Sequence, residues 1–307
     1  VVFLGELHDN PWHHENQAEA VRALAPKAVV FEMLTAEDAA KVTPDLIGDK
    51  AALAEVLNWA ESGWPSFDMY YPIFAAAEGA AIHGALVPRE AVREAIMGGD
   101  VVASFGAGAA TYGLAAPLDG AEQAEREAAQ MASHCNALPE NMLAGMVLGQ
   151  RLRDATMARE IVRAYEAHGG PVAVITGNGH ARLDWGAPAY LRAAEPEIAI
   201  LALGQGETDT GAPSGVFDVV EIAPPSLLVV AAQIVLGSNI GCQFVGSKLR
   251  DIARDLVLGL GSCVSMLLCA TAFTLASAAL IEAPLPNVFL AFSPGGLTEM
   301  SLLALAM

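Results

Sequence analysis

Cysteine and positive charge are both scarce in this chain of 307 residues. Cys135 is the only cysteine before Pro224, so that part of the chain cannot form an internal disulfide. No Cys-x-x-Cys spacing supports a zinc ribbon or a thioredoxin-type site. Sixteen Lys and Arg residues stand against 35 Asp and Glu residues, which gives a formal net charge of −19. Because nucleic-acid affinity comes mostly from neutralised phosphates, no DNA or RNA partner is expected.

An initiator Met and a signal peptide are also missing. The chain begins in an apolar run, residues 1–4, and stops at Met307 inside another apolar run. We therefore expect both ends to be cut, so the lack of a targeting segment says nothing about location.

Charged residues become rare after Pro224-Pro225. From Ser226 onward there are three basic and four acidic residues, so 18 of the 19 net negative charges belong to the preceding part. Residues 256–281 are 26 consecutive positions without Asp, Glu, Lys, Arg or His. About 20 apolar helical residues span a hydrocarbon core of about 30 Å. We therefore predict a water-soluble domain over residues 1–224 and a C-terminal all-α membrane segment over residues 225–307. About three spans are expected, at 226–246, 256–281 and 285–307.

The third predicted span is interrupted by Pro294, Gly295 and Gly296, and Glu299 lies in its apolar run. Broken helices expose backbone groups to substrates in transporters, and an ionisable residue inside a span is commonly functional. These four residues are the candidate functional positions of the membrane segment. A re-entrant or incomplete span is the open alternative.

A short basic stretch lies between the first two predicted spans and contains Lys248, Arg250 and Arg254. Basic loops favour the cytoplasmic side of a membrane. This orientation predicts that the soluble domain lies outside the cytoplasm.

The part before Pro224 alternates short apolar runs with helical patterns. Strand-like runs fall at 1–4, 28–31, 80–83, 172–176, 198–203 and 216–222. Helical periodicity covers 14–25, 50–61, 68–78, 88–97, 121–134, 140–168 and 187–194. Such alternation predicts a layered α/β fold with a largely parallel sheet flanked by helices. Ligands of such sheets bind at the carboxyl ends of the strands.

Two similar motifs follow strands at that edge. Gly5-Glu6-Leu7-His8 leaves the first strand, and Gly177-Asn178-Gly179-His180 leaves the strand at 172–176. Glycine permits backbone conformations with positive φ, so each turn can be tight and direct its imidazole into a cleft. We predict that His8 and His180 share a site with Glu6 and Glu32. The alternative is that each histidine only hydrogen-bonds its own loop.

Further candidates surround these motifs. His13 and His14 begin a helix and point about 100° apart, so they cannot hold a metal side by side. One of them could join the cleft, and the other is expected as a cap or at the surface. The aromatic segment 64–72 predicts either the wall of a flat apolar ligand site, with Trp64 shaping it, or simple core packing. Tyr70 could ligate haem iron as a phenolate. His134-Cys135 is expected to be a buried structural pair.

The segments 3–11, 64–72, 150–158 and 177–188 together resemble the ChaN-like family of haem-binding proteins. That family is related to the TIKI and erythromycin-esterase group. The resemblance implies an iron-regulated, often lipid-anchored protein of the bacterial envelope that binds haem and serves haem or iron uptake. It carries over His8, His180, Glu6 and Glu32 as site residues; Gly5, Gly177, Asn178 and Gly179 shape that site. The partners expected are haem and, through the tail, membrane lipid, and a homodimer is left open.

The segment 289–301 resembles the AbrB family of membrane proteins, which are transporter-like and sometimes labelled ammonia monooxygenases. Only about 80 residues of that family's length are present.

Several functions therefore remain open. One is haem binding joined to a partial transporter region, and another is a transporter fragment with an extracytoplasmic sensor. A third is a hydrolase in which His8 and His180 hold a divalent metal such as zinc and Glu6 acts as general base. A fourth is a chimeric or truncated product whose two parts have no joint function. No catalytic residue is assigned, and an enzyme is not favoured.

Overall fold

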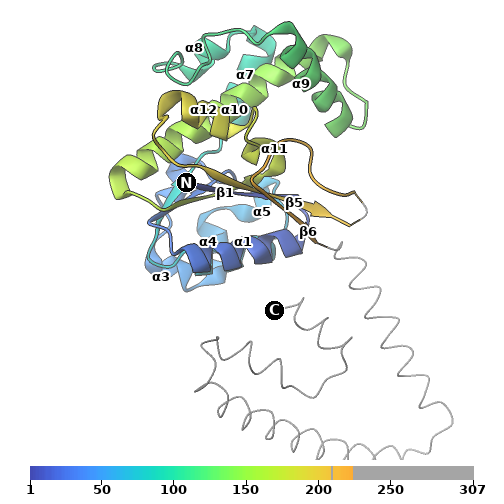
Figure 1. Cartoon of the computed structure of the whole chain (residues 1–307). Helices are drawn as coiled ribbons and strands as arrows, with labels where there is room; N and C mark the ends of the chain where they lie inside the picture. The colour runs from blue at the N-terminus through green and yellow to red at the C-terminus, as the bar shows by residue number, and fades with distance from the viewer. Residues whose placement is uncertain (209, 224–307) are drawn as a thin grey trace, which may run out of the picture. The chain divides into compact units, whose positions relative to one another are not determined.

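The computed structural model describes residues 1–208 and 210–223 (Figure 1). The predictions made for residues 225–307, including the three spans and Pro294, Gly295, Gly296 and Glu299, lie outside these residues. Among the helices of the described part, none is both long and apolar enough to cross a membrane. The proposed domain boundary at residue 224 stays a prediction.

Six strands form one sheet in the described part of the chain, and every neighbouring pair is parallel. Their order across the sheet is β3-β2-β4-β1-β5-β6. The strands are β1 (Val2–Glu6), β2 (Ala28–Phe31), β3 (Ala81–Gly84), β4 (Val172–Gly177), β5 (Leu201–Glu207) and β6 (Val219–Ala223). The predicted α/β class and parallel sheet are confirmed.

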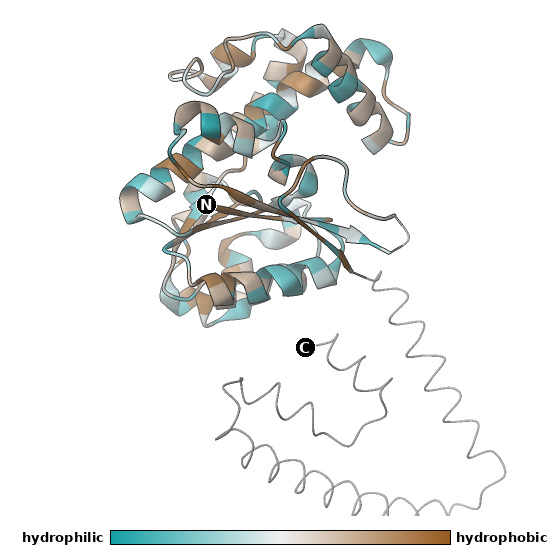
Figure 2. Cartoon of the chain, viewed as in Figure 1, coloured by the Kyte–Doolittle hydropathy of each residue, from teal (hydrophilic) through white to brown (hydrophobic). Residues whose placement is uncertain are grey.

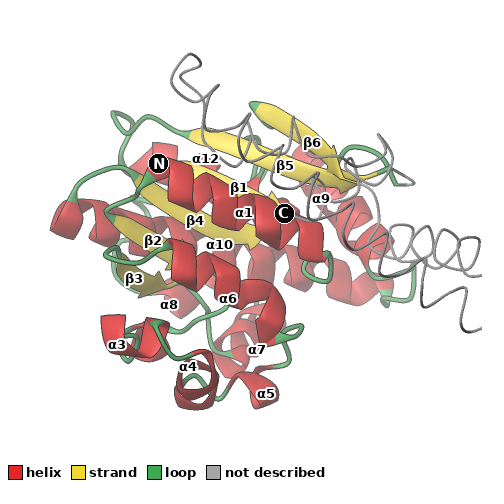
Figure 3. Cartoon of the chain, turned by 90° about the horizontal axis from the view of Figure 1, so that it is seen from below, coloured by secondary structure: helices red, strands yellow, loops and turns green. Residues whose placement is uncertain are grey.

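The described helices run along both faces of this sheet (Figures 1 and 3). They are α1 (Pro11–Leu24), α2 (Ala36–Ala39), α3 (Pro44–Ile47), α4 (Lys50–Val56), α5 (Trp59–Ser62), α6 (Phe67–Ala76), α7 (Arg89–Gly98), α8 (Val101–Phe105), α9 (Gly120–Ser133), α10 (Glu140–His168), α11 (Asn178–Ala181) and α12 (Ala187–Ala194).

One predicted helix is divided in the structure. The pattern at 50–61 is interrupted at Asn58, whose φ of 47° lies in the left-handed region, so α4 and α5 are separate. Helices α2, α3, α8 and α11 were not predicted. Each has only four or five residues, which is too short to show a helical period.

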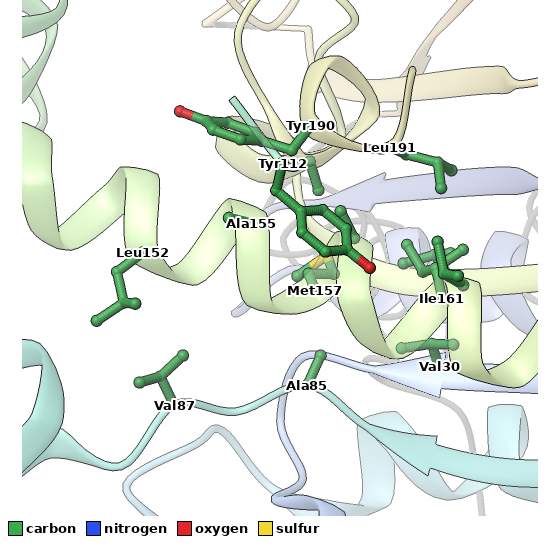
Figure 4. Close-up of a cluster of buried hydrophobic side chains, with 14 of the residues drawn as sticks. Val30, Ala85, Val87, Tyr112, Leu152, Ala155, Met157, Ile161, Tyr190 and Leu191 are labelled. Carbon is green, nitrogen blue, oxygen red and sulfur yellow. The ribbon is translucent and has the colours of Figure 1, made fainter. Parts of the chain in front are cut away.

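Helix α10 is the centre of the layer on one face of the sheet. Its buried side contacts α7, α8, α9 and α12 as well as β2, β3 and β4. Figure 4 shows Leu152, Ala155, Met157 and Ile161 of α10 among side chains from the sheet and from α12, all within one buried cluster.

Helices α1 and α6 cover the opposite face, where they pack side by side (Figure 3). Phe31 of β2 stacks on Phe74 of α6 with ring centroids 4.4 Å apart and planes 6° apart. Along β1, Phe3 belongs to the cluster around α10 and Leu4 to the cluster under α1 and α6, as the alternation of a strand requires. The strands at the centre of the sheet are covered on both faces and appear brown in Figure 2, whereas the end of β5 is teal.

The strand register sets where the polar side chains meet. Glu6, the last residue of β1, is paired with Gly177, the last residue of β4. Phe31 ends β2 opposite Ile175 of β4, and the next residue, Glu32, donates its backbone N–H to the Ile175 carbonyl. The three strand ends therefore deliver their polar residues to the same edge of the sheet.

Candidate functional site

The carboxyl edge of the sheet brings together the two histidines that the sequence singles out. His8 and His180, with Glu32, line one pocket of about 360 Å³, and Trp64 and Arg153 lie on its wall. A second pocket of about 680 Å³ adjoins it and shares His8, His180 and Arg153. His8 and His180 therefore line a common cleft, as predicted. The functional role of each of these two histidines remains a prediction.

Glu6 is buried beside His8 and organises its surroundings. One carboxylate oxygen, Oε1, accepts hydrogen bonds from His8 Nδ1 at 2.7 Å and from the Tyr70 hydroxyl at 2.9 Å. The other oxygen lies 3.3 Å from His14 Nδ1. Burial alone would raise the pKa of Glu6, but the hydrogen bonds from His14 and His8 outweigh it and lower the pKa to about 2. Glu6 is therefore an anion that fixes the His8 ring.

Tyr70 does not fit the predicted role of an iron ligand. It is fully buried on α6, and its hydroxyl is already bound to Glu6. Burial and the negative charge of Glu6 raise its pKa, which keeps the phenol protonated. Tyr70 instead helps to hold the Glu6 carboxylate in place through this hydrogen bond.

His13 and His14 correct another expectation, because both are completely buried and neither lies at the surface. His13 accepts the Leu7 N–H at Nδ1 and faces the Gly206 carbonyl with Nε2, so it carries one ring proton and is neutral. The signal for their burial was non-local: α6 covers this part of α1.

His14 has only hydrogen-bond acceptors around its ring. Nε2 faces the His8 carbonyl at 2.9 Å, while Nδ1 faces Gln17 Oε1 at 3.2 Å and the carboxylate of Glu6. The Gln17 amide is oriented by its donation to the Leu4 carbonyl, so the atom facing His14 is an oxygen. Both ring nitrogens of His14 therefore carry protons, and its charge balances that of Glu6.

Glu32 also lines the pocket beside His8. Its Oε2 accepts hydrogen bonds from the Thr176 hydroxyl at 2.6 Å and the Gly177 N–H at 2.8 Å. Burial would raise the pKa of Glu32, but the charges of His180 and His8 outweigh it and lower the pKa. This carboxylate therefore remains ionised next to the pocket.

His180 is oriented by Asp154, which lies in the segment 150–158 that the sequence linked to the family without giving this residue a role of its own. Its Nδ1 donates to Asp154 Oδ1 at 2.6 Å, and its Nε2 lies 3.6 Å from Glu32 Oε1. Burial would lower the pKa of His180, but Glu32 and Asp154 raise it to about 9. Asp154 sits fully buried in the middle of α10, where no local pattern marks it.

The three glycines predicted to shape the site act differently from one another. None of Gly5, Gly177 and Gly179 has a positive φ, so the expected reason for these glycines is wrong. Gly5 is required by close approach, since a Cβ there would lie 2.5 Å from Asn178 Oδ1, and a Cβ at Gly177 would lie 3.0 Å from His8 Nε2. Gly179 has no such crowding.

Asn178 ties α11 to the neighbouring strand. Its side chain donates to the Gln205 carbonyl at 2.7 Å and accepts the Gln205 N–H at 3.0 Å. Gln205 in turn donates to the carbonyls of Gly5 and His13. This amide network, which sequence reasoning missed, holds the ends of β1, β4 and β5 in place.

Trp64 stands against the edge of the site, with its ring centroid 4.9 Å from that of His8 in a T-shaped contact. The predicted burial of His134-Cys135 is wrong, because both residues are exposed. No group of three or more His, Cys, Asp or Glu side chains arranged to hold a metal ion occurs in the described residues.

Comparison with known proteins places this geometry in a family. The family model described as haem-binding uptake, Tiki superfamily, ChaN matches residues 1–191. This match covers more than half of the chain, and the chain therefore belongs to that family. The predicted resemblance, and haem as the cofactor of the family, are confirmed. No curated protein matches the chain.

Two solved structures are similar. A structure of cofacial haem binding to ChaN of Campylobacter jejuni has a TM-score of 0.50 and 20% identity, covering 67% of this chain and 80% of its own. At this identity it supports the α/β fold alone. The type III effector HopBA1 has a TM-score of 0.42 and 13% identity, covering 73% of this chain and 87% of its own.

The tail also matches a family model, over residues 210–307, which is described as the transition state regulatory protein AbrB. The matched family has the same name, AbrB, as the family that the sequence was predicted to resemble. That description concerns a regulator, so it gives no support to the membrane and transporter predictions.

The His180–Asp154 pair predicts a stability change in mild base. A raised histidine pKa stabilises the fold below the ordinary value of 6.5, and this contribution is lost as the pH rises through about 9. The unfolding free energy should fall by on the order of 3 kcal/mol over this interval. Asp154→Asn should remove most of that dependence, whereas Glu160→Gln on the same helix should keep it. Urea unfolding at several pH values measures both, and equal slopes in the two variants would contradict the assignment.

Gly177→Ala should push the His8 ring away from Glu6, because the new Cβ would meet Cε1 and Nε2 of that ring at 3.0 Å. The pKa of His8, which the Glu6 hydrogen bond holds above its usual value against the effect of burial, should then fall. Gly179→Ala is the matched control, since its Cβ meets only Gln150 Nε2 at 4.0 Å. NMR titration of His8 distinguishes them, and an unchanged His8 titration in Gly177→Ala would refute the contact.

Proposed function

We propose that the domain before Pro224 binds haem in the pocket beside His8 and serves haem or iron uptake. The observation that carries this proposal is the His8 ring. Its Nδ1 is held by Glu6, while its side chain is 38% exposed and lines the pocket. No hydrogen-bond partner of Nε2 occurs in the described residues, so that atom is free to meet an iron axially.

The carboxylate behind His8 suits this role. Histidines that bind metals commonly donate their other ring N–H to a carboxylate, which fixes the ring orientation and raises the basicity of the ligand atom. Glu6 stands in that position at 2.7 Å, and its anionic form is secured by His14. The ring is therefore set in advance in the orientation that ligation requires.

The pocket wall suits a flat apolar ring. Its lining includes the apolar side chains of Ala85, Leu86, Val87 and Pro88 together with the indole ring of Trp64. Sites for small cofactors combine such apolar surface with a few placed polar groups. Haem bound here would supply the iron centre, while the residues of this chain position the ring and exclude water from its face.

We also propose a homodimer as the haem-loaded form. The relative from Campylobacter jejuni is described as binding haem cofacially. The pocket beside His8 has the volume of a site for one ligand of this kind, so a cofacial pair would draw on two copies of the chain. Light scattering before and after addition of haemin tests this assembly, and a mass unchanged from the monomer would reject it.

The haem assignment predicts a specific loss in one variant. Full-length chain in detergent should develop a Soret band on titration with haemin, and His8→Ala should weaken binding by about 100-fold or more. Removal of only an outer-shell partner already costs about 10–100-fold. His168→Ala, at the exposed end of α10, is the control. Equal affinities in the two variants would exclude His8 as the ligand.

We further propose that residues 226–307 hold the chain in a bacterial membrane, with the haem-binding domain on the envelope side. The 26 uncharged residues at 256–281 and the basic stretch after the first predicted span support this arrangement. On this proposal the break at Pro294, Gly295 and Gly296, with Glu299, would face a transported substrate.

The membrane proposal predicts that the full chain stays in the pellet after carbonate extraction, whereas a chain ending at residue 224 is released. External protease should degrade the domain in spheroplasts. Release of the full chain by carbonate would refute the anchoring. Sequencing of the source genome across Pro225 separates a genuine fusion from a chimeric product.

A further inference from the structure

The pocket beside His8 gathers cations in a strongly acidic chain. Its wall includes Arg89, Arg153 and His180, and Glu32 is the carboxylate among its lining residues. The part of the chain before Ser226 carries 18 of the 19 net negative charges, so this wall has the opposite sign to its surroundings. A cationic cleft in an anionic protein concentrates anionic ligands at that cleft.

The two arginines of this wall differ from other basic residues of the domain. Arg126, Arg163 and Arg182 each pair with a nearby carboxylate. Arg89 and Arg153 form no such pair with the carboxylates of the described residues, although acidic side chains outnumber basic ones two to one. Both arginines are exposed, and each retains N–H groups that can donate to a carboxylate from solution.

Arg89 is also positioned at the pocket. Its Nη2 donates to the Ser62 carbonyl at 3.3 Å, which places the guanidinium over the loop that carries Trp64. Gly63 allows this approach, since its φ is 83° and a Cβ there would lie 2.8 Å from Nη2. Arg153 enters from α10 and lines both adjoining pockets.

We propose that Arg89 and Arg153 bind the propionate carboxylates of the tetrapyrrole, so that this pocket selects rings with free acid groups. The inference rests on the haem-binding function proposed above and adds its specificity. The apolar wall holds the ring, His8 addresses the metal, and the two arginines orient the acidic edge. Each arginine acts by charge and hydrogen bonding, independently of the iron.

Metal-free protoporphyrin IX tests this proposal, because it removes the iron from the comparison. Full-length chain in detergent is titrated with the free acid and with its dimethyl ester, and binding is followed by porphyrin fluorescence. Partition into micelles is the same for all variants, so the ratio of the two affinities is the informative quantity. The wild-type chain should favour the acid, and Arg89→Ala/Arg153→Ala should reduce that preference about tenfold.

The matched control is Arg93→Ala/Arg192→Ala, which removes two exposed or partly exposed arginines away from this pocket, one of them a helical turn beyond Arg89. It should keep the preference for the acid. Equal binding of acid and ester by the wild-type chain, or an equal loss in both double variants, would overturn the proposal.

The outcome is separable from the haem assignment. A His8-dependent Soret band with no arginine effect would leave the haem function standing and reject the propionate contacts. An arginine-dependent preference for the acid without a His8 effect on haemin would reject His8 ligation and keep the carboxylate selectivity.

Discussion

A single buried carboxylate, Glu6, constrains most of what surrounds it. An anion without water must be neutralised and fully hydrogen-bonded, because an uncompensated buried charge is strongly destabilising. Here His8 in the turn after β1 and Tyr70 on α6 donate hydrogen bonds to Oε1, and the charged ring of His14 on α1 faces Oε2 at 3.3 Å. The close packing of α1 on α6 is therefore coupled to the orientation of His8, one of the two imidazoles that line the pocket. The Glu6 carboxylate therefore affects both the stability of the α1–α6 packing and the orientation of His8.

The other half of the site follows the same rule from different strands. Glu32 is neutralised by donors at the end of β4 and by the nearby His180, which Asp154 holds from α10. Both histidines thus carry a carboxylate behind the ring and face a common pocket. Gly177 contacts both groups of residues. Its N–H donates to Glu32, and its lack of a side chain leaves room for the His8 ring. A parallel sheet makes this possible, because its strand ends converge at one edge.

The sequence was sufficient to predict the α/β fold class and to single out the polar residues at the strand ends. Apolar runs and long periodic helices gave the α/β class, and the paired Gly-x-x-His motifs placed His8 and His180 together because parallel topology sends such motifs to one edge. Burial of His13 and His14 was not accessible, because it depends on elements distant in sequence: His14 packs on Tyr70 of α6, and His13 faces the Gly206 carbonyl of β5. Asp154 and Gln205 were missed for a related reason. Their roles arise from partners distant in sequence, and neither breaks the local pattern of its element.

The ligands available in this site favour a ring-bound iron over a bare ion. A structural or catalytic zinc takes three or four protein ligands, and the described residues offer no such group. One oxygen of each nearby carboxylate already accepts two hydrogen bonds: Glu6 Oε1 from His8 and Tyr70, and Glu32 Oε2 from Thr176 and Gly177. Haem brings four equatorial nitrogens of its own and needs little more than one axial donor from the protein. On the proposed function, the oriented imidazole of His8 beside an apolar wall would meet that need, and His180 would shape the electrostatics of the cleft.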